Sequence, residues 1–183
     1  MMSKELSPQW VLLGLLMREP MHGYELHQFF TPPSPLGHIW YLGISQMYKL
    51  LKELEEQGHV EVTIETQENR PDKKVYHVTP SGRESFLDWL QTPVRGMRLI
   101  RVEFLGKLFL AQALGPEMLE RLIDLQTKAC QGLLRTLEAG LPGEGFENLV
   151  LRFRAGQIEA TIDWLGLCRA QLLPRDQATA EET

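Results

Sequence analysis

The spacing of apolar residues changes twice along this chain, and the order of these changes limits the possible folds more than any other feature. Residues 60–65 and 74–79 alternate apolar and polar side chains, the pattern of two half-buried strands, and the polar residues 67–72 join them as a hairpin. Short helical patterns precede the hairpin, and only long helical patterns follow residue 93. The sequence therefore predicts a mainly α fold with a small β-hairpin, in which an N-terminal winged helix-turn-helix precedes an all-helical domain.

Capping residues mark the limits of the N-terminal domain. Ser7 followed by Pro8 predicts a helix start, and Thr79 followed by Pro80 repeats this signal after the hairpin. The predicted order is then helix, helix, helix, hairpin and a closing helix. We expect this domain to span residues 1–92.

The third predicted helix, about Ser45 to Gln57, is the candidate recognition helix. Ser45 is its expected N-cap, and Gly58 follows its end. Its apolar stripe recurs at steps of three and four residues and consists of Met47, Leu50, Leu51 and Leu54. The opposite face is polar. There Gln46 can pair bidentately with adenine, and Ser45 or Tyr48 can donate to phosphates.

The charge of the chain argues against DNA binding when it is taken as a whole. The formal net charge is −5, and residues 1–92 carry eight positive and twelve negative side chains, which leaves −4. A DNA-binding domain is expected to be basic. Five of the eight positive residues nevertheless lie on the third helix or the hairpin, and these are Lys49, Lys52, Arg70, Lys73 and Lys74. The helix lysines are alternatively a solvated face shared with glutamates, but the order of elements favours DNA binding.

Beyond the hairpin, long helical patterns cover about residues 99–114, 116–139 and 146–173. We expect residues 93–173 to form a helical dimerisation domain and the polar residues 174–183 to form a disordered tail. The last helix has a heptad seam that Arg169 interrupts. The seam residues expected to contact a partner subunit are Leu151, Ile158, Ile162, Leu165 and Leu172. The alternative is that this face packs within its own helical domain.

No group of residues points to catalysis. The five histidines have no metal-ligand spacing, and no phosphate-binding glycine loop or nucleophile motif is present. Cys130 and Cys168 are isolated, which predicts buried thiols in a reducing cytoplasm. Charged residues interrupt the richest apolar window, residues 97–114, so a membrane span is not expected. We therefore expect a cytoplasmic protein that is not an enzyme and has no catalytic, metal or cofactor site.

Three motifs occur in order along the N-terminal domain. HGYEL at residues 22–26 begins the second helix, where Gly23 permits a tight entry and Tyr24 and Leu26 are expected to pack inside. ISQMYKLLKELEEQG at residues 44–58 covers the third helix, and KVY with TPSGR follows over residues 74–83. With these motifs the chain resembles the PadR family of bacterial transcriptional regulators over about residues 11–90. Its last helices resemble the longer PadR subgroup, which has a helical C-terminal domain.

The resemblance implies a homodimeric repressor that binds an inverted-repeat operator in double-stranded DNA and is relieved by a small-molecule effector. By motif, the recognition-helix contacts would be Ser45, Gln46, Tyr48, Lys49 and Lys52. The wing contacts to phosphate or minor groove would be Arg70, Lys73 and Lys74. The alternative is a winged-helix module that binds a protein or a small ligand without contacting DNA, which the net −4 of residues 1–92 supports.

A cavity for an effector is the least determined feature of the sequence. Apolar and aromatic side chains that suit such a cavity between subunits are Met97, Phe104, Phe109, Met118 and Trp164. Residues of these types at helical spacing are more often ordinary core. The sequence therefore assigns no effector-binding residue.

Overall fold

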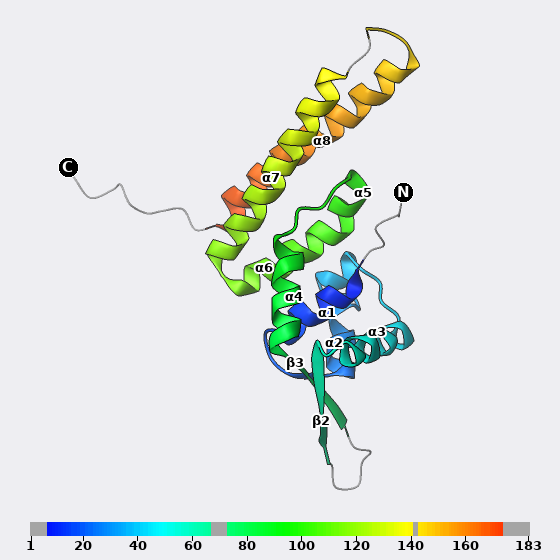
Figure 1. The fold of residues 1–183 in the computed structure, drawn as a ribbon, viewed down its shortest axis with the longest axis vertical. Coiled ribbons are helices and arrows are strands. Elements are labelled where there is room, and N and C mark those ends of the chain that lie inside the picture. The colour runs from blue at the N-terminus through cyan, green and yellow to red at the C-terminus, as the bar shows by residue number, and fades with distance from the viewer. Residues whose placement is uncertain (1–6, 67–72, 141–142, 174–183) are drawn as a thin grey trace, which may run out of the picture. The chain divides into compact units, whose positions relative to one another are not determined.

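The computed structural model describes residues 7–66, 73–140 and 143–173. The chain divides into two compact units, residues 1–113 and 114–183 (Figure 1). The separation into a DNA-binding domain and a dimerisation domain after residue 92 stays a prediction. By packing alone, residues 93–113 belong with the first unit: a Cβ added at Gly14 would lie 2.5 Å from the Leu110 side chain.

The first unit is built around α1 (Pro8–Leu16), in which every residue from position 11 to 16 is buried. Helices α3 (Ile44–Glu56) and α4 (Pro80–Gln91) pack against it, as does strand β3 (Lys73–Val78). The remaining helical elements are α2 (Gly23–Phe29), the short turn η1 (Leu36–His38), α5 (Met97–Leu99), the π-helical turn η2 (Ile100–Phe104) and α6 (Leu105–Leu114). The predicted helices of the N-terminal domain are confirmed.

Three antiparallel strands form one small sheet in the order β1-β3-β2. The hairpin consists of β2 (Val60–Glu65) and β3, as the alternating pattern predicts. The third strand, β1 (Met21–His22), pairs with β3 at Tyr76 and Val75. The sequence does not predict β1, because two residues are too few to show a period of two.

Thr79 caps α4, as its sequence position predicts. Its Oγ1 accepts a hydrogen bond from the Gly82 N–H at 3.1 Å and donates one to the Gly58 carbonyl at 2.7 Å. The second bond ties the start of α4 to the turn after α3, where Gly58 has a φ of 73°. The helix start also lies close to the chain before β2, since a Cβ added at Gly82 would be 2.1 Å from the His59 carbonyl oxygen.

The predicted N-cap of α3 is wrong. The helix begins at Ile44 after Gly43, whose extended backbone occupies the N-cap position, so Ser45 lies in the first helical turn. Glycine is only slightly less favourable than serine at an N-cap, which is why the sequence signal was ambiguous. As a result the Ser45 hydroxyl is not the cap, and its side chain is exposed.

The second unit consists of α7 (Pro116–Ala139) and α8 (Phe146–Leu172), which pack side by side. The predicted seam of α8 faces α7 in the same chain: Ile158 and Leu165 are buried, and Arg169 bonds to Glu120 and Asp124 of α7. This contact explains why an arginine interrupts the seam. Of the other seam residues expected to contact a partner, Leu151 and Ile162 are half-buried and Leu172 is exposed.

A second apolar face of α8 is exposed in the chain. Its large side chains are between 57% and 81% exposed and are Phe146, Leu149, Phe153 and Leu167. Their spacing places them on one side of the helix, opposite Ile158 and Leu165. The small residues Gly156 and Ala160 lie between them on this face and are exposed as well.

Both cysteines are free thiols and buried, as expected. Burial raises the pKa of the Cys168 thiol, which keeps it protonated and unreactive at neutral pH. Along the described parts of the chain, no helix combines the length and the apolar character needed to cross a membrane.

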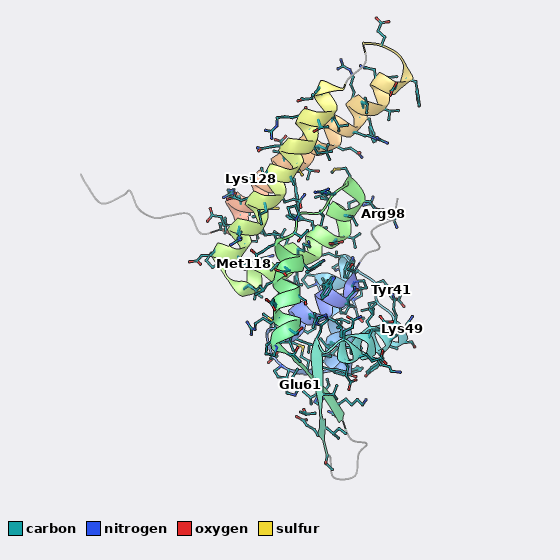
Figure 2. All side chains as sticks on the ribbon, viewed as in Figure 1. Tyr41, Lys49, Glu61, Arg98, Met118 and Lys128 are labelled. Atoms are coloured by element: carbon teal, nitrogen blue, oxygen red, sulfur yellow. The ribbon has the colours of Figure 1, made fainter. Side chains whose placement is uncertain are left out.

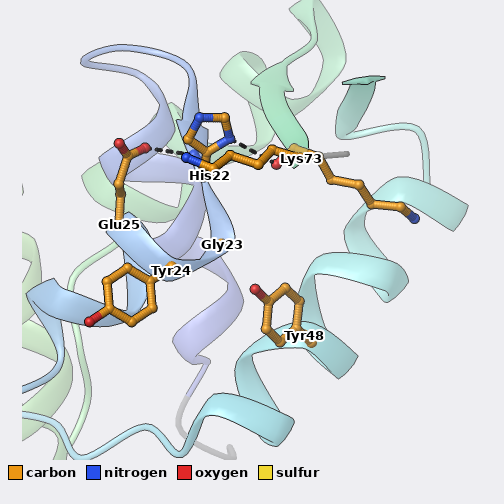
Figure 3. Close-up of a pocket in the computed structure, with 7 residues that line it drawn as sticks. His22, Gly23, Tyr24, Glu25, Tyr48 and Lys73 are labelled. Atoms are coloured by element: carbon orange, nitrogen blue, oxygen red, sulfur yellow. Dashed lines mark hydrogen bonds between the residues drawn. The ribbon is translucent and has the colours of Figure 1, made fainter. Parts of the chain in front are cut away.

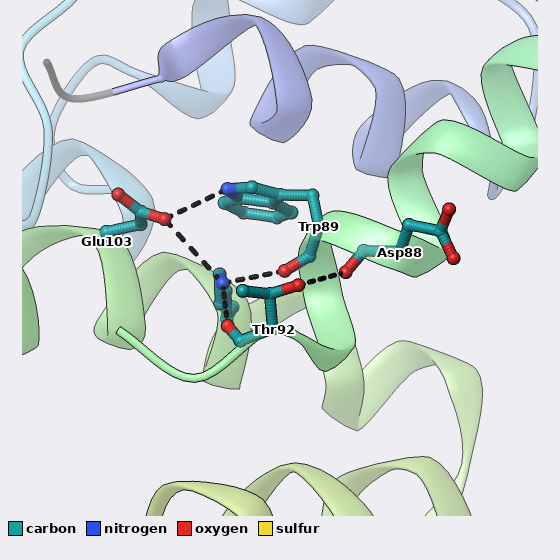
Figure 4. A network of polar contacts seen from close by, with 5 residues as sticks. Asp88, Trp89, Thr92 and Glu103 are labelled. Atoms are coloured by element: carbon teal, nitrogen blue, oxygen red, sulfur yellow. Dashed lines mark hydrogen bonds and ion pairs between the residues drawn. The ribbon is translucent and has the colours of Figure 1, made fainter. Parts of the chain in front are cut away.

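A buried ionic network joins the end of α4 to the helix that follows it (Figure 4). The Lys107 ammonium is 1% exposed and donates to the carbonyls of Trp89 at 2.7 Å and Thr92 at 2.6 Å. The Glu103 carboxylate lies 3.6 Å from this ammonium and accepts a hydrogen bond from the Trp89 indole at 3.0 Å. Lys107 thus satisfies carbonyls at the C-terminus of α4, where a positive charge is favoured.

We expect Lys107→Met to lower the free energy of unfolding by about 3–5 kcal/mol, because it leaves Glu103 buried without its counter-charge. Replacing both members, Lys107→Met with Glu103→Leu, should cost less than the sum of the single changes. Urea unfolding followed by circular dichroism measures both values. The control is Lys128→Met on α7, where the lysine is exposed, and we expect it to change the free energy of unfolding little. If Lys107→Met also changed the free energy of unfolding this little, the result would contradict a structural role for the network.

Candidate nucleic-acid interface

Helix α3 presents a polar face to solvent along its first nine residues, 44–52. The residues predicted to contact DNA are all exposed there, and they are Ser45, Gln46, Tyr48, Lys49 and Lys52. The apolar stripe on the other side is buried at Met47, Leu51 and Leu54. Because the buried stripe holds α3 on the core of the first unit, the polar face has a fixed orientation.

The lysines of this face are engaged only in weak pairs. Lys49 Nζ lies 3.8 Å from Glu53 Oε1, and Lys52 Nζ lies 3.6 Å from Glu56 Oε1, all four side chains being well exposed. Exposed pairs of this kind contribute about 0.3–0.5 kcal/mol. Both ammonium groups can therefore exchange these carboxylates for phosphates at little cost.

The distribution of acidic residues answers the objection from net charge. No Asp or Glu occurs from Leu26 to Lys52, a segment that covers most of α2, the connection with η1, and the first nine residues of α3. The acidic residues of α3 are confined to its last four positions, 53–56. The start of α3 is therefore locally basic in an acidic chain. Tyr41, which precedes it, is 90% exposed, and both Tyr41 and Lys49 are labelled in Figure 2.

The wing contributes two further lysines. Lys73 and Lys74 begin β3 and are exposed, and Lys73 is paired across the hairpin with Glu65. The third predicted wing contact, Arg70, lies outside the described residues. Along the described part of the hairpin, the positive charge is thus concentrated at the end away from the core.

A groove of about 560 Å³ brings α2, α3 and β3 together (Figure 3). Its lining residues come from these elements and from β1, and they are His22, Gly23, Tyr24, Glu25, Tyr48, Lys73 and Lys74. The groove brings Tyr48 of α3 together with Lys73 and Lys74 of the wing. The sequence predicted all three as DNA contacts but did not predict that they share one groove. Ser45, Gln46, Lys49 and Lys52 are not part of it and lie along α3.

The expected position of Tyr24 is wrong. Leu26 is fully buried as predicted, but Tyr24 is 64% exposed and lines the groove. In a seven-residue helix with one buried side, residues 24 and 26 point to different sides. Tyr76 of β3, by contrast, is buried, and this burial, followed by the charges of Tyr48 and Glu55, raises the pKa of its hydroxyl.

The sequence did not predict that His22 and Gly23 belong to the same site as Tyr48. His22 donates its backbone N–H to Glu25 Oε2 at 2.8 Å, and its ring Nδ1 donates to the Lys74 carbonyl at 3.3 Å. The first bond lies within the start of α2, and the second crosses from there to the wing. The HGYEL motif drew attention to His22 and Gly23 in the sequence. Their proximity in space to α3 and β3, however, depends on how these elements pack in the fold.

No group of three or more histidine, cysteine or acidic side chains suited to a metal ion is found in residues 7–66, 73–140 and 143–173. The exposed polar residues of α3 and of the start of β3 include the ammonium groups of Lys49, Lys52, Lys73 and Lys74 and the hydrogen-bond donors Ser45, Gln46 and Tyr48. Such groups recognise phosphates and base edges.

Two known families match this chain in succession. Residues 12–88 match the transcriptional regulator PadR-like family, and residues 100–172 match the family described as virulence activator alpha C-term. The first match covers the helices and hairpin that carry the candidate interface. The second covers η2, α6, α7 and α8.

Two relatives by sequence are described as transcriptional regulators. The negative transcriptional regulator PadR of Bacillus subtilis is 28% identical over 130 residues, which are 71% of this chain and 70% of that protein. A probable transcriptional regulator of Mycobacterium tuberculosis is 33% identical over 87 residues, 48% of this chain and 45% of that protein. The crystal structure of Bacillus subtilis PadR in complex with operator DNA covers 93% of this chain and 99% of its own, at 23% identity and a TM-score of 0.49. Residues 12–88 of this chain thus form a domain similar to the PadR-like family of transcriptional regulators, and residues 100–172 are similar to the virulence activator alpha C-term family.

Proposed function

We propose that this protein is a sequence-specific DNA-binding regulator that acts as a homodimer on an inverted-repeat operator and represses transcription. Helix α3 enters the major groove, where Gln46 reads a base edge and Ser45, Lys49 and Lys52 reach base edges or phosphates. Lys73 and Lys74 of the wing contact the neighbouring backbone, together with Arg70. Repression follows the Bacillus subtilis relative, which is a negative regulator.

One observation carries this proposal: α3 has an exposed face with hydrogen-bond donors and lysines, and within this helix no acidic residue precedes position 53. A winged-helix module that binds only a protein or a small ligand does not need this segregation of charge. The family match also favours the DNA-binding function over that alternative. Relief of repression by a small molecule remains a prediction. Of the residues suggested for such a cavity, Phe104 is fully buried in the described structure and serves as core.

We propose that the second apolar face of α8, defined by Phe146, Leu149, Phe153 and Leu167, contributes to the dimer. These side chains are too large and too exposed to remain in water in a monomer. Gly156 and Ala160 between them allow a partner helix to approach closely. The predicted seam then has a divided role, since Ile158 and Leu165 hold α8 on α7, while Leu151, Ile162 and Leu172 remain accessible to differing extents.

The function is tested with a labelled duplex from the region directly upstream of the gene for this protein. We expect specific binding by two subunits per site, with the logarithm of affinity falling linearly with the logarithm of salt concentration. Unrelated DNA serves as competitor, and two salt concentrations are compared. Absence of any preference for this duplex, followed by the same result with a random-sequence selection, would contradict the proposal.

Reversing two charges on α3 tests the recognition helix. We expect Lys49→Glu with Lys52→Glu to weaken binding to the upstream duplex by about a hundredfold or more, because both ammonium groups become carboxylates facing phosphates. Thermal unfolding should change little, since both lysines are exposed. The matched control is Lys128→Glu with Arg135→Glu on α7, which changes net charge equally. Unchanged binding by the α3 variant would remove this helix from the interface.

A single charge on α8 tests the dimer face. We expect Phe153→Lys to sediment as a monomer at micromolar concentration, because it places an ammonium group in an apolar interface. Glu159→Lys, on a different side of the same helix, should remain dimeric. Analytical ultracentrifugation distinguishes the two states, and a dimeric Phe153→Lys variant would exclude this face from the interface.

A further inference from the structure

We propose that the groove between α2, α3 and β3 seats one backbone phosphate of the bound DNA, and that Gly23 is the residue that positions Tyr48 for this contact. The inference rests on the proposed function and adds to it a defined phosphodiester site. Tyr48, the exposed neighbour of Lys49 on α3, lines this groove, so a DNA strand that follows the exposed face of α3 reaches the groove at Tyr48.

Gly23 leaves the space that the Tyr48 ring occupies. A Cβ at position 23 would lie 2.5 Å from Tyr48 Cε1 and 2.7 Å from its hydroxyl oxygen, closer than real Cβ contacts. Gly23 is not among the residues with a positive φ, so its backbone conformation is open to any residue. The glycine is therefore required by the approach of the ring, and the ring lies where it does because no side chain stands at position 23.

The His22 side chain connects the start of α2 to the wing that carries Lys73 and Lys74. The His22 ring donates to the Lys74 carbonyl at 3.3 Å, and its Nε2 lies 3.6 Å from Glu65 Oε2. His22, which directly precedes Gly23, thus contacts both strands of the hairpin. Lys73 extends from β3 on the side of Gly23 where Tyr48 lies (Figure 3).

The charges and donors of the groove select an anion with free oxygens. Lys73 and Lys74 supply two ammonium groups, and Tyr48 and Tyr24, both exposed residues, supply two hydroxyls. Glu25 is the one carboxylate of the lining, and its Oε2 accepts the His22 N–H at 2.8 Å. A phosphodiester carries one negative charge and two free acceptor oxygens, and lysine and tyrosine side chains are common partners of DNA phosphates.

Two substitutions test separately the hydroxyl group of Tyr48 and the position of its ring. Tyr48→Phe removes only the hydroxyl, whereas Gly23→Ala keeps the hydroxyl and displaces the ring. We expect each to weaken binding to a short duplex of unrelated sequence at low salt by about tenfold, since a hydrogen bond to a charged group is lost. The slope of log affinity against log salt should stay unchanged for Tyr48→Phe and fall by about 0.9 for Lys73→Gln.

The control is Gly132→Ala on α7, where an added Cβ meets nothing within 4 Å, and we expect its affinity to equal that of the wild type. Thermal unfolding of every variant excludes a general loss of structure. Alanine is a better helix former than glycine, so a folded Gly23→Ala with weakened binding is the expected combination. Wild-type affinity in both Gly23→Ala and Tyr48→Phe would overturn the groove as a phosphate site while the proposed function stands. A wild-type protein that binds no duplex would overturn the proposed function itself.

Inorganic phosphate distinguishes the source of the anion. We expect the amide resonance of Gly23 to shift when the duplex is added. Inorganic phosphate at the same phosphate concentration and ionic strength should not displace the duplex. Displacement of the duplex by inorganic phosphate would identify a site for a free anion and overturn the assignment to the DNA backbone.

Discussion

The burial of α1 is the constraint on which the rest of the first unit depends. Every residue from position 11 to 16 is removed from water, and α3, α4 and β3 all pack on this one short helix. Apolar burial of this kind is the main source of folding free energy in small domains. Because α3 is held by its buried stripe, its other side is directed outward with little freedom. The orientation of the candidate recognition face is thus a consequence of the core.

An acidic chain can bind DNA when its charges are separated in space. The overall charge of −5 is unfavourable for long-range attraction to DNA, but the segment from Leu26 to Lys52 contains no acidic residue. Weak non-specific attraction leaves more of the discrimination to base contacts and to the spacing of two half-sites in a dimer. Local charge is therefore the relevant quantity for this interface.

The helices and the hairpin could be predicted because their signals are local. Proline after Ser7 and after Thr79, the stripe of α3 and the alternation of residues 60–65 each act within one element. The predicted cap of α3 was wrong because Gly43 can occupy the N-cap position as well as Ser45 can. The seam of α8 packs on α7 at Ile158 and Leu165, and its contact with a partner subunit stays a prediction.

The sequence by itself determined the order of the main helices and of the hairpin, the residues of the polar face of α3 and the family motifs, because periodicity and capping depend on neighbours in the chain. Only the tertiary structure decided that Gly23 lies under the Tyr48 ring, that Tyr24 faces solvent, and that Lys107 closes the end of α4. These contacts join residues that are 15 or more positions apart or depend on which side of a short helix is buried. Packing of separate elements sets such distances, and no local pattern encodes them.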